Sequence, residues 1–507
     1  MSFKKKAVSL SCLAVVLPAL LIGCSKEAAE NGSSSGSSTA TASTSTSQEP
    51  YVVKIVMADD ADDEAVKAVA AEASKITQAK FNTTIELVRY GFSSFNQQRN
   101  LMLSSGEKID LMPSLGLTVP NAANSGQVVP LNDLLEQYGK DMLEQIPQAD
   151  WDSTSVDGKI YAVRNNKELA SGYGYAVPTE YLEALGTDVS TIKTEDDFEN
   201  LLRAAKSKFP DMYPLVSDAG TMGYYISSKD DLGGDPGVLE DATTDNTTVV
   251  NWYATDTYKD IVTRRHKWQK EGLLLPNGST NSESATSLIK AGKAFSSIAN
   301  TKPGVEGEIE RSTGKPMTII ELVPPYSTTN NINNLWYVAH NSENPGRAVQ
   351  VLNEMYTNPE LANILIYGVE GKNYVVKDAD KGIIDYPDGM DAGNKTYSVD
   401  PWAWPNELIS YVWASDSPTV WQDTLKFNET AIKSVAKGFV WNNSKVLPEI
   451  AAVNNVLAKY VNALDCGDLD PADTLPRFEK ELKNAGIDKI IAEKQTQLDA
   501  WLAQNKQ

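Results

Sequence analysis

Cysteine and histidine are scarce in this chain. Among 507 residues there are three cysteines and two histidines. The histidines, His266 and His340, are far apart and have no acids near them at the spacing of a metal site or a serine-type triad. A histidine-based zinc centre and a triad hydrolase are therefore not indicated, and we expect neither a metal nor a cofactor.

A surplus of positive charge is also missing. Lysine and arginine number 46 against 67 aspartates and glutamates, which gives a formal net charge of -21. Such a surface repels phosphates, so we expect no nucleic-acid partner. The stretch GSSSG (residues 32–36) matches the nucleophile-elbow pattern, but no strand or helix flanks it, so we interpret the match as accidental.

Long apolar runs are absent except at the N-terminus. Residues 7–22 form an apolar stretch behind Lys4, Lys5 and Lys6. The stretch is short for a membrane helix, which needs about 20 apolar residues. A basic start, a short apolar middle and small residues at the end are typical of a secretory signal peptide, which we assign to residues 1–23.

The end of this segment, Leu-Ile-Gly-Cys, resembles the lipobox of bacterial lipoproteins. The resemblance implies cleavage before Cys24 and acylation of its thiol. Residues 33–47 contain only Ser, Thr, Ala and Gly, a composition that cannot bury apolar surface. We predict that residues 24–50 are a lipidated cysteine and a disordered tether at the extracellular face of the cell membrane. A plain signal peptide with an incidental cysteine is the alternative.

Cleavage would leave a mature chain with one free thiol. Removing residues 1–23 takes away three lysines and no acids, so the net charge moves from -21 to -24. Cys466 would then be the cysteine left after acylation, which excludes a disulfide framework. We expect Cys466 to be a small core residue.

The body of the chain alternates strand and helix signals. Beta-rich runs at 51–57, 83–90 and 109–115 are separated by helical patterns near 62–76 and 97–103. This order predicts an α/β lobe with a parallel sheet, because each crossover helix must cover a sheet face. About 457 residues after Pro50 exceed the usual size of one domain and favour two lobes.

Ligands gather at the carboxyl ends of the strands in such sheets. Tyr90 ends the second predicted strand, and Ser114 lies near the end of the third. We therefore name both as candidate ligand-binding residues.

The order of segments resembles the extracellular solute-binding lipoproteins of ABC importers, in the carbohydrate-type branch. The resemblance covers nearly all of the mature chain. The final stretch resembles a helical C-terminal module found in one subgroup. The stretches that carry the resemblance include VVPLNDLLEQYGKDML, VDGKIYAV, NPGRAVQVLNEMYTNPELANILIYGVEGKNYVV and, at the end, LPRFEKELKNAGIDKIIAEKQTQLDAWL.

The resemblance implies a two-lobe, periplasmic-binding-protein-like α/β fold with a hinge and a cleft. The chain would leave the first lobe near Asn165, return near Val323 and cross again near Gly368. The first lobe would comprise residues 51–165 and 324–367, and the second residues 166–323 and 368–507 with a helical end. A ligand trapped in the cleft would be delivered to a membrane permease. The resemblance implies an oligosaccharide ligand and a binding protein without catalysis, and we expect a monomer.

Aromatic residues in polar loops are the strongest candidates for sugar contact. The C–H face of a pyranose packs on aromatic rings, while its hydroxyls need amide and carboxylate partners. Trp402 and Trp404 stand beside Pro401, Pro405 and Asn406 rather than in an apolar repeat. We predict that one of these tryptophans stacks on the ligand with Asn406 nearby; packing between helices is the alternative. Pro405 departs from relatives, which often have glycine there.

Five further residues complete the candidate site. Trp336 follows a polar stretch but also fits the start of a strand. Tyr224 and Tyr225 follow the flexible sequence AGTMG and fit a buried strand start equally well. Asn300 ends a strand where related proteins contact their ligand, and Glu370 lies beside a predicted hinge, although a solvated loop carboxylate is the simpler interpretation.

Three other functions remain open at this stage. A peptide or another polar solute would require a cleft with a fixed pair of opposite charges. A surface glycan hydrolase would require two carboxyl groups about 5 to 10 Å apart in a groove. A passive adhesin, or a sensor that partners a kinase, would show no hinge motion.

Overall fold

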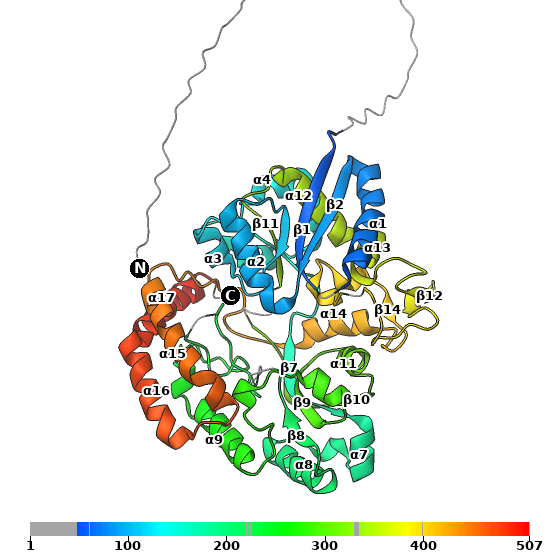
Figure 1. Cartoon of the computed structure of the whole chain (residues 1–507). Coiled ribbons are helices and arrows are strands. Elements are labelled where there is room, and N and C mark those ends of the chain that lie inside the picture. The colour runs from blue at the N-terminus through cyan, green and yellow to red at the C-terminus, as the bar shows by residue number, and fades with distance from the viewer. Residues whose placement is uncertain are drawn as a thin grey trace, which may run out of the picture. The chain divides into compact units, whose positions relative to one another are not determined.

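The computed structural model describes residues 48–59, 61–218, 222, 226–234, 236–328, 334–397 and 399–505, without the side chains of residues 92 and 93. All of them lie in one compact unit, residues 48–507. This unit contains two five-stranded sheets (Figure 1). We call each sheet, with the elements packed on it, a lobe.

The sheet of the first lobe has the order β2-β1-β3-β11-β6. Strand β1 is parallel to β2 and β3, whereas β11 is antiparallel to β3 and β6. The parallel β-α-β-α-β start that the sequence predicts is therefore present. The strands are β1 (Tyr51–Ala58), β2 (Thr83–Tyr90), β3 (Leu111–Pro113), β6 (Val163–Arg164) and β11 (Leu335–Val338).

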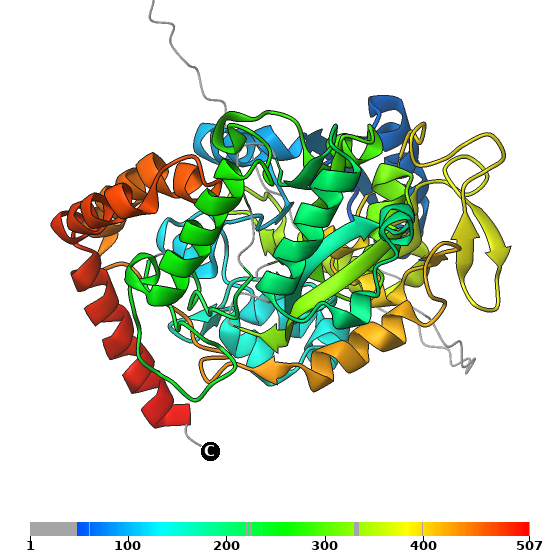
Figure 2. The same ribbon diagram turned by 90° about the horizontal axis from the view of Figure 1, so that it is seen from below.

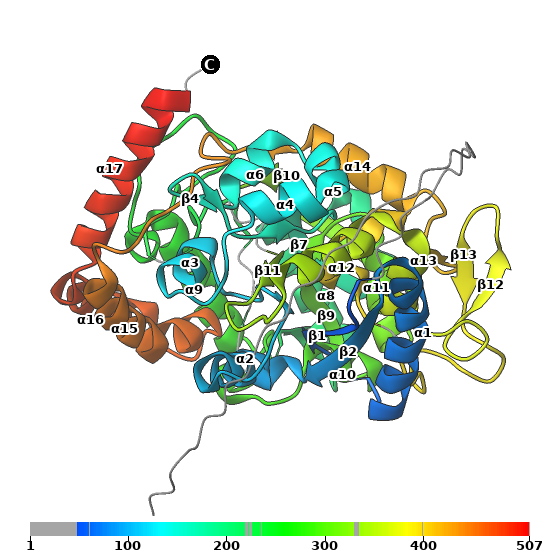
Figure 3. The same ribbon diagram turned by 90° about the horizontal axis from the view of Figure 1, so that it is seen from above.

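Alternation along β1 explains why helices cover both faces of this sheet. Val53, Ile55 and Met57 face one core together with α1 (Asp63–Phe81), α12 (Pro345–Thr357) and α13 (Pro359–Tyr367). Val56 and Ala58 face a second core with α2 (Phe92–Ser105) and α3 (Val119–Asn124). Helix α12 comes late in the chain but lies beside α4 (Asn132–Tyr138) and α5 (Lys140–Gln145) (Figure 3). Short elements α6 (Gln148–Ser153), β4 (Ser155–Val156) and β5 (Lys159–Ile160) precede β6.

The sheet of the second lobe has the order β15-β10-β7-β9-β8. Its long strands β7, β9 and β10 are antiparallel where they pair with one another. Helix α8 starts with the predicted capping box, in which Thr194 and Asp197 bond each other's backbone N–H groups. The strands are β7 (Ser171–Pro178), β8 (Tyr213–Val216), β9 (Ala294–Thr301), β10 (Met317–Ser327) and β15 (Ile432–Lys433). The helices are α7 (Thr179–Leu185), α8 (Glu195–Lys208), α9 (Asp256–Lys270), α10 (Ala285–Lys290) and α11 (Val305–Thr313).

The chain returns to the second lobe later than the predicted Gly368. A small sheet of β12 (Val375–Asp378), β13 (Ile383–Asp385) and β14 (Val412–Trp413) follows α13. Its residues Ile384 and Trp413 are buried in the core of the first lobe, as is Tyr397. Only after Trp413 does α14 (Val420–Thr430) lead to β15 in the second sheet. Residues 368–413 belong to the first lobe because their apolar side chains complete the core around α13.

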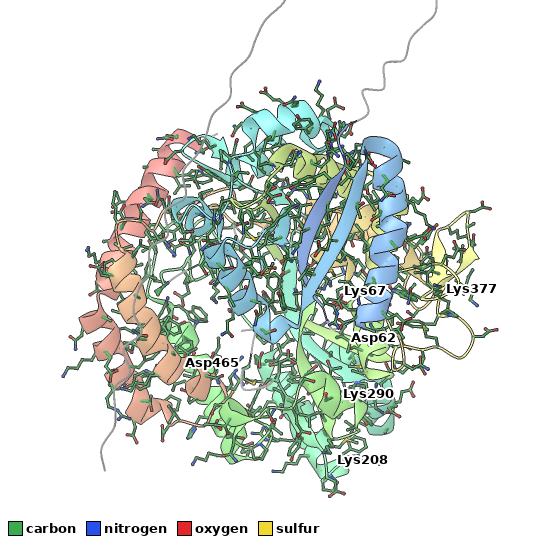
Figure 4. The ribbon with its side chains drawn as sticks, turned by 45° about the horizontal axis from the view of Figure 1, so that its top comes forward. Asp62, Lys67, Lys208, Lys290, Lys377 and Asp465 are labelled. Carbon is green, nitrogen blue, oxygen red and sulfur yellow. The ribbon has the colours of Figure 1, made fainter. Side chains whose placement is uncertain are left out.

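Three helices end the chain: α15 (Leu447–Asp465), α16 (Pro471–Ala485) and α17 (Ile487–Asn505). They share a core with α9 and Trp252, and Figure 2 shows them in orange and red at the edge of the unit. The hydroxyl of Tyr258 in α9 donates to Asp465, labelled in Figure 4, at 3.1 Å. Cys466 is buried where these helices meet the second lobe, in line with its predicted core role.

Two glycines let β7 pass close to its neighbours. A Cβ added at Gly172 would collide with the side chain of Thr301, and one added at Gly174 would collide with the carbonyl oxygen of Ile320 in β10. The pairing of β7 and β10 is irregular just beyond this point, between Glu321 and Tyr326. The sheet therefore depends on the missing side chains at these two positions.

We predict that Gly174→Ala destabilises the second lobe by about 1–3 kcal/mol, because the added methyl group meets backbone rather than a movable side chain. Thermal unfolding of residues 48–507 checks this. Gly393→Ala is the matched control, since Gly393 is exposed and its added methyl approaches only side-chain atoms. Equal melting temperatures for the two variants would contradict the prediction.

Candidate ligand-binding cleft

A cavity of about 930 Å³ lies between the two sheets. Its volume is near the top of the range of small-ligand pockets, about 300–1,000 Å³. The first lobe contributes residues that follow β2 and β3, and the second contributes residues from β7, β9 and β10. The lining includes Phe95, Asn96, Leu115, Gly116, Lys167, Glu168, Ser171, Tyr173, Asp218, Lys229, Asp231, Asn300, Lys302, Glu308, Tyr326, Thr328, Asn334 and Trp402.

Aromatic rings from distant parts of the chain line this cavity. Tyr173 and Tyr326 lie on neighbouring strands with ring centroids 6.2 Å apart and planes tilted by 54°. The Tyr326 hydroxyl donates to the carbonyl of Ser227 at 3.2 Å. Burial raises the pKa of Tyr326 well above its ordinary value, so the hydroxyl stays neutral. Trp402 lies in a short 3-10 turn, Pro401–Ala403, and its carbonyl accepts a 2.9 Å bond from the Asn165 side chain.

Lysine–carboxylate pairs supply most of the charge in the cavity. Lys302 lies 3.0 Å from Glu308. Lys167 forms a close ion pair with Glu168, and Lys229 forms one with Asp231. Paired in this way, the charges offer strong hydrogen-bond donors and acceptors while the cavity holds little unbalanced charge.

A buried pair of glutamates lies where the chain crosses between the lobes. Burial and the neighbouring charge of Glu168 raise the pKa of Glu407 to about 8. Burial also acts to raise the pKa of Glu168, but the charges of Lys302 and Lys167 outweigh it and hold that pKa well below its usual range. At neutral pH Glu168 is therefore ionised and Glu407 is protonated, since two adjacent buried carboxylates would repel each other.

The described residues offer neither a metal-binding cluster nor a helix that could span a membrane. No group of three or more His, Cys, Asp or Glu side chains in this part of the chain is placed to hold a metal ion. Within the same residues, no helix combines the length and apolarity that crossing a membrane requires.

Residues 58–362 match the family model described as bacterial extracellular solute-binding protein. The chain belongs to this family. Residues 435–503, which contain all of α15 and α16 and most of α17, match a separate domain of unknown function (DUF3502). The predicted C-terminal module is thus confirmed as a unit of its own in the sequence.

Relatives of this solute-binding protein resemble it over most of its length. A carbohydrate ABC transporter substrate-binding protein of Streptococcus pneumoniae is 27% identical over 99% of both chains. The crystal structure of the N-glycan transport solute-binding protein NgtS from the same species is 25% identical, covers 90% of this chain and 100% of that one, and has a TM-score of 0.79. Its complex with Man5GlcNAc gives a TM-score of 0.78 at 25% identity. The predicted two-lobe binding-protein fold is confirmed.

The structure brings two of the predicted site residues of this solute-binding protein into the cavity. Trp402 lines it from one side, and Asn300, near the end of β9, lines it from the second lobe. The Oδ1 atom of Asn300 is buried and has no hydrogen-bond partner among the described residues. Buried acceptors are normally paired, so this oxygen is well suited to a ligand hydroxyl.

Trp336, Trp404 and Asn406 were predicted for the cleft, but the structure places them in the core of the first lobe. The two indole rings are 1% and 2% exposed and stack with centroids 5.6 Å apart. Asn406 is 1% exposed; its side chain donates to the carbonyl of Tyr356 at 2.8 Å and accepts from the amide of Leu408. The proline-rich loop packs against the sheet at Trp404, which therefore becomes a core residue although it lies in neither a helix nor a strand.

Three other predicted residues lie outside the cavity lining. Ser114 is 1% exposed, and its hydroxyl accepts from the amide of Leu335, which joins β3 to β11. Tyr90 is half-buried, with its hydroxyl 3.6 Å from the sulfur of Met102. Glu370 is exposed at a bridge to Tyr374. The end of β3 does reach the cavity, because Leu115 and Gly116, which directly follow Ser114, line it. Tyr224, Tyr225 and Cys24 lie outside the described residues.

Sequence reasoning missed Tyr173, Tyr326 and the lysine–carboxylate pairs. A signal for Tyr173 exists in SGYGYAV, where glycines alternate with larger residues at the period of a strand. Register pairs Tyr173 with Asn300 across β7 and β9. No comparable signal marks Lys229 or Lys302, because their partners are specified by loop conformation and by distant segments.

The pKa of Glu407 predicts a pH-dependent stability. The folded protein binds more protons than the unfolded chain between about pH 4 and about pH 8. The contribution of Glu407 is therefore fully present below this window and is lost as pH rises through it. The low pKa of Glu168 acts in the opposite sense, but only below about pH 4. We expect Glu407→Gln, which keeps the neutral form, to reduce the loss of stability toward high pH by a few kcal/mol, at about 1.4 kcal/mol per pKa unit.

Thermal midpoints of both proteins, measured at about pH 5 and about pH 9, check this expectation. Glu370→Gln is the control, since that carboxylate is exposed and outside the cavity. The wild type should lose more melting temperature between the two pH values than Glu407→Gln does. An equal or smaller loss in the wild type would contradict the raised pKa of Glu407.

Proposed function

We propose that this solute-binding protein captures an oligosaccharide in the cleft and delivers it to the permease of an ABC importer. The observation that carries the proposal is the make-up of the cavity. The aromatic rings of Phe95, Tyr173, Tyr326 and Trp402 share it with the amides of Asn96, Asn300 and Asn334. Rings for C–H faces and amides for hydroxyls are the two elements of sugar recognition. Relatives described as a carbohydrate substrate-binding protein and as NgtS in complex with a glycan support it.

The ligand would act on the protein by favouring closure of the two lobes. Asn96 and Gly116 reach the cavity from the first lobe, while Asn300 and Tyr173 reach it from the second. A ligand that contacts both sides favours the arrangement in which the lobes are close together. The permease would then recognise the loaded form by the relative position of the two lobes.

We also propose that no covalent chemistry takes place in the cleft. A glycosidase needs one protonated and one ionised carboxyl group on either side of the scissile bond. Among the carboxylates that line the cavity, Glu168, Glu308 and Asp231 each pair with a lysine. Protonated Glu407 is buried behind Glu168 rather than across the cavity from it, and it does not line the cavity. This arrangement favours binding over hydrolysis.

The lipid anchor belongs to the same proposal. The lipobox-like sequence before Cys24, together with membership of an extracellular family, supports a lipoprotein on the outer face of the cell membrane, which we propose acts as a monomer. Residues between Cys24 and Gln48, where the compact unit begins, would be the tether.

Calorimetric titration of residues 48–507 with mono- and oligosaccharides tests the proposed ligand, with products checked by chromatography. We expect saturable binding of an oligosaccharide without hydrolysis. Trp402→Ala should weaken binding at least about tenfold, because the stacking and burial of an indole exceed about 1.4 kcal/mol. Trp501→Ala is the matched control, since Trp501 is half-buried on α17 and contacts Phe439 outside the cavity.

The other outcomes are distinct. Turnover of the glycan would show a hydrolase instead. Binding of peptides but of no saccharide would keep the binding role and replace the ligand class. Equal affinities of Trp402→Ala and wild type would remove Trp402 from the ligand site.

The anchor predicts a simple change of location. Cys24→Ala should abolish acylation, because the thiol that would carry the lipid is removed. The protein should then be released from membranes into the medium or the soluble fraction. Fractionation of cells that make the full-length chain, with metabolic labelling by a fatty-acid analogue, measures both effects. Cys466→Ala is the control, and loss of labelling in that variant would contradict the assignment of Cys24.

A further inference from the structure

One lysine of the C-terminal module occupies a position that an apolar residue would normally fill. Lys494 lies on α17 between Ile490 and Leu498, at the four-residue spacing that places three side chains on one helix face. Both neighbours are fully buried, and Lys494 is 0% exposed. A buried ammonium group is costly unless its three donors are used, so its partners indicate why it is there.

Lys494 donates to backbone carbonyls within, and just after, a loop that lines the cleft. Its Nζ atom donates to the carbonyls of Gly234 at 2.7 Å, Gly237 at 2.9 Å and Asp231 at 3.3 Å. The ammonium group also lies 5.2 Å from the ring centre of Trp441. We call residues 229–234 the cleft loop. Two of its residues, Lys229 and Asp231, line the ligand cavity.

The backbone of the cleft loop has an unusual conformation that suits this lysine. Leu232, Gly233 and Gly234 follow one another with φ of 52°, 84° and 94°, and Gly237 has φ of 102°. Glycine adopts a positive φ without strain, so Gly233, Gly234 and Gly237 suit these positions. The carbonyls that converge on Nζ would face one another without the cation between them.

A second contact fixes the other end of the cleft loop. Asp230 is fully buried; its side chain accepts from the amide of Leu232 at 2.9 Å and from the hydroxyl of Ser434 at 2.6 Å. Ser434 directly precedes the region that matches the domain of unknown function. Lys229 in turn lies 5.5 Å from the ring of Trp252, which is part of the core of the module. The loop is therefore held at its start and along its length by the last part of the chain.

We propose that Lys494 is a positioning residue for the ligand site. It holds the cleft loop in the conformation that turns Lys229 and Asp231 toward the ligand, and through it the C-terminal module takes part in ligand binding without touching the ligand. This inference rests on the proposed function, since it needs a saccharide in the cleft.

A double-variant cycle on residues 48–507, the unit that contains every described core, tests the proposal. The probe is the saccharide that the wild type binds most tightly in calorimetry. We expect Lys494→Met to weaken binding at least tenfold and Lys229→Met with Asp231→Asn to weaken it as well. In the background of those two changes, adding Lys494→Met should cost no more than about twofold. Independent effects would multiply instead.

Lys489→Met is the matched control, because Lys489 lies on the same helix, is exposed and pairs with Glu449. It should bind as the wild type does. If Lys494→Met does not fold by circular dichroism, Ser434→Ala replaces it, since it loosens the same loop through Asp230. Two results would overturn the positioning role alone. One is a folded Lys494→Met variant that binds as tightly as the wild type. The other is an equal loss of affinity on adding Lys494→Met to the wild type and to the variant with Lys229→Met and Asp231→Asn. Absence of saccharide binding by the wild type would overturn the proposed function, and this inference with it.

Discussion

The backbone clasp at the first crossing between the lobes is the constraint on which the cleft depends. The amide of Asn166 donates to the carbonyl of Pro405 at 2.7 Å, and the amide of Glu407 donates to the carbonyl of Asn166 at 3.1 Å. The amide of Asn165 donates to the carbonyl of Asn334 at 3.0 Å. Three segments that are distant in the sequence thus meet through backbone hydrogen bonds. Because Trp402 is bonded to Asn165, its ring takes its place in the cleft from this clasp.

Buried charge at the clasp is arranged so that each charged group has a partner. Glu168 lies between Lys167 and Lys302, and Lys302 also reaches Glu308. Removing one member of such a group would leave an uncompensated charge in a dry site, which costs more than the group gains when complete. Protonated Glu407 fits this arrangement, because a second negative charge beside Glu168 would have no cation left to balance it.

Much of the fold was predictable from the sequence because its signals are local. The strands and helices of the first lobe follow from periods of two and of 3.6 residues, and the capping box at Thr194 marks a helix start. The site was less predictable. Trp402 and Trp404 share one loop and one composition, yet a single 3-10 turn sends the first to the cavity and the second into the core. Likewise, the pairing of Tyr173 with Asn300 depends on sheet register, which neither residue specifies alone.

The cleft also depends on residues beyond the part of the chain that the family model matches. The family model ends at residue 362, while Trp402, Glu407 and Lys494 all follow it. The side chain of Asn165 fixes the turn that carries Trp402, and α17 fixes the loop that carries Lys229 and Asp231. Asn165 and Lys494 both bond to backbone carbonyls, so they hold these parts of the cavity lining in place without entering the cavity. In this chain the helical C-terminal module is therefore a support of the cleft.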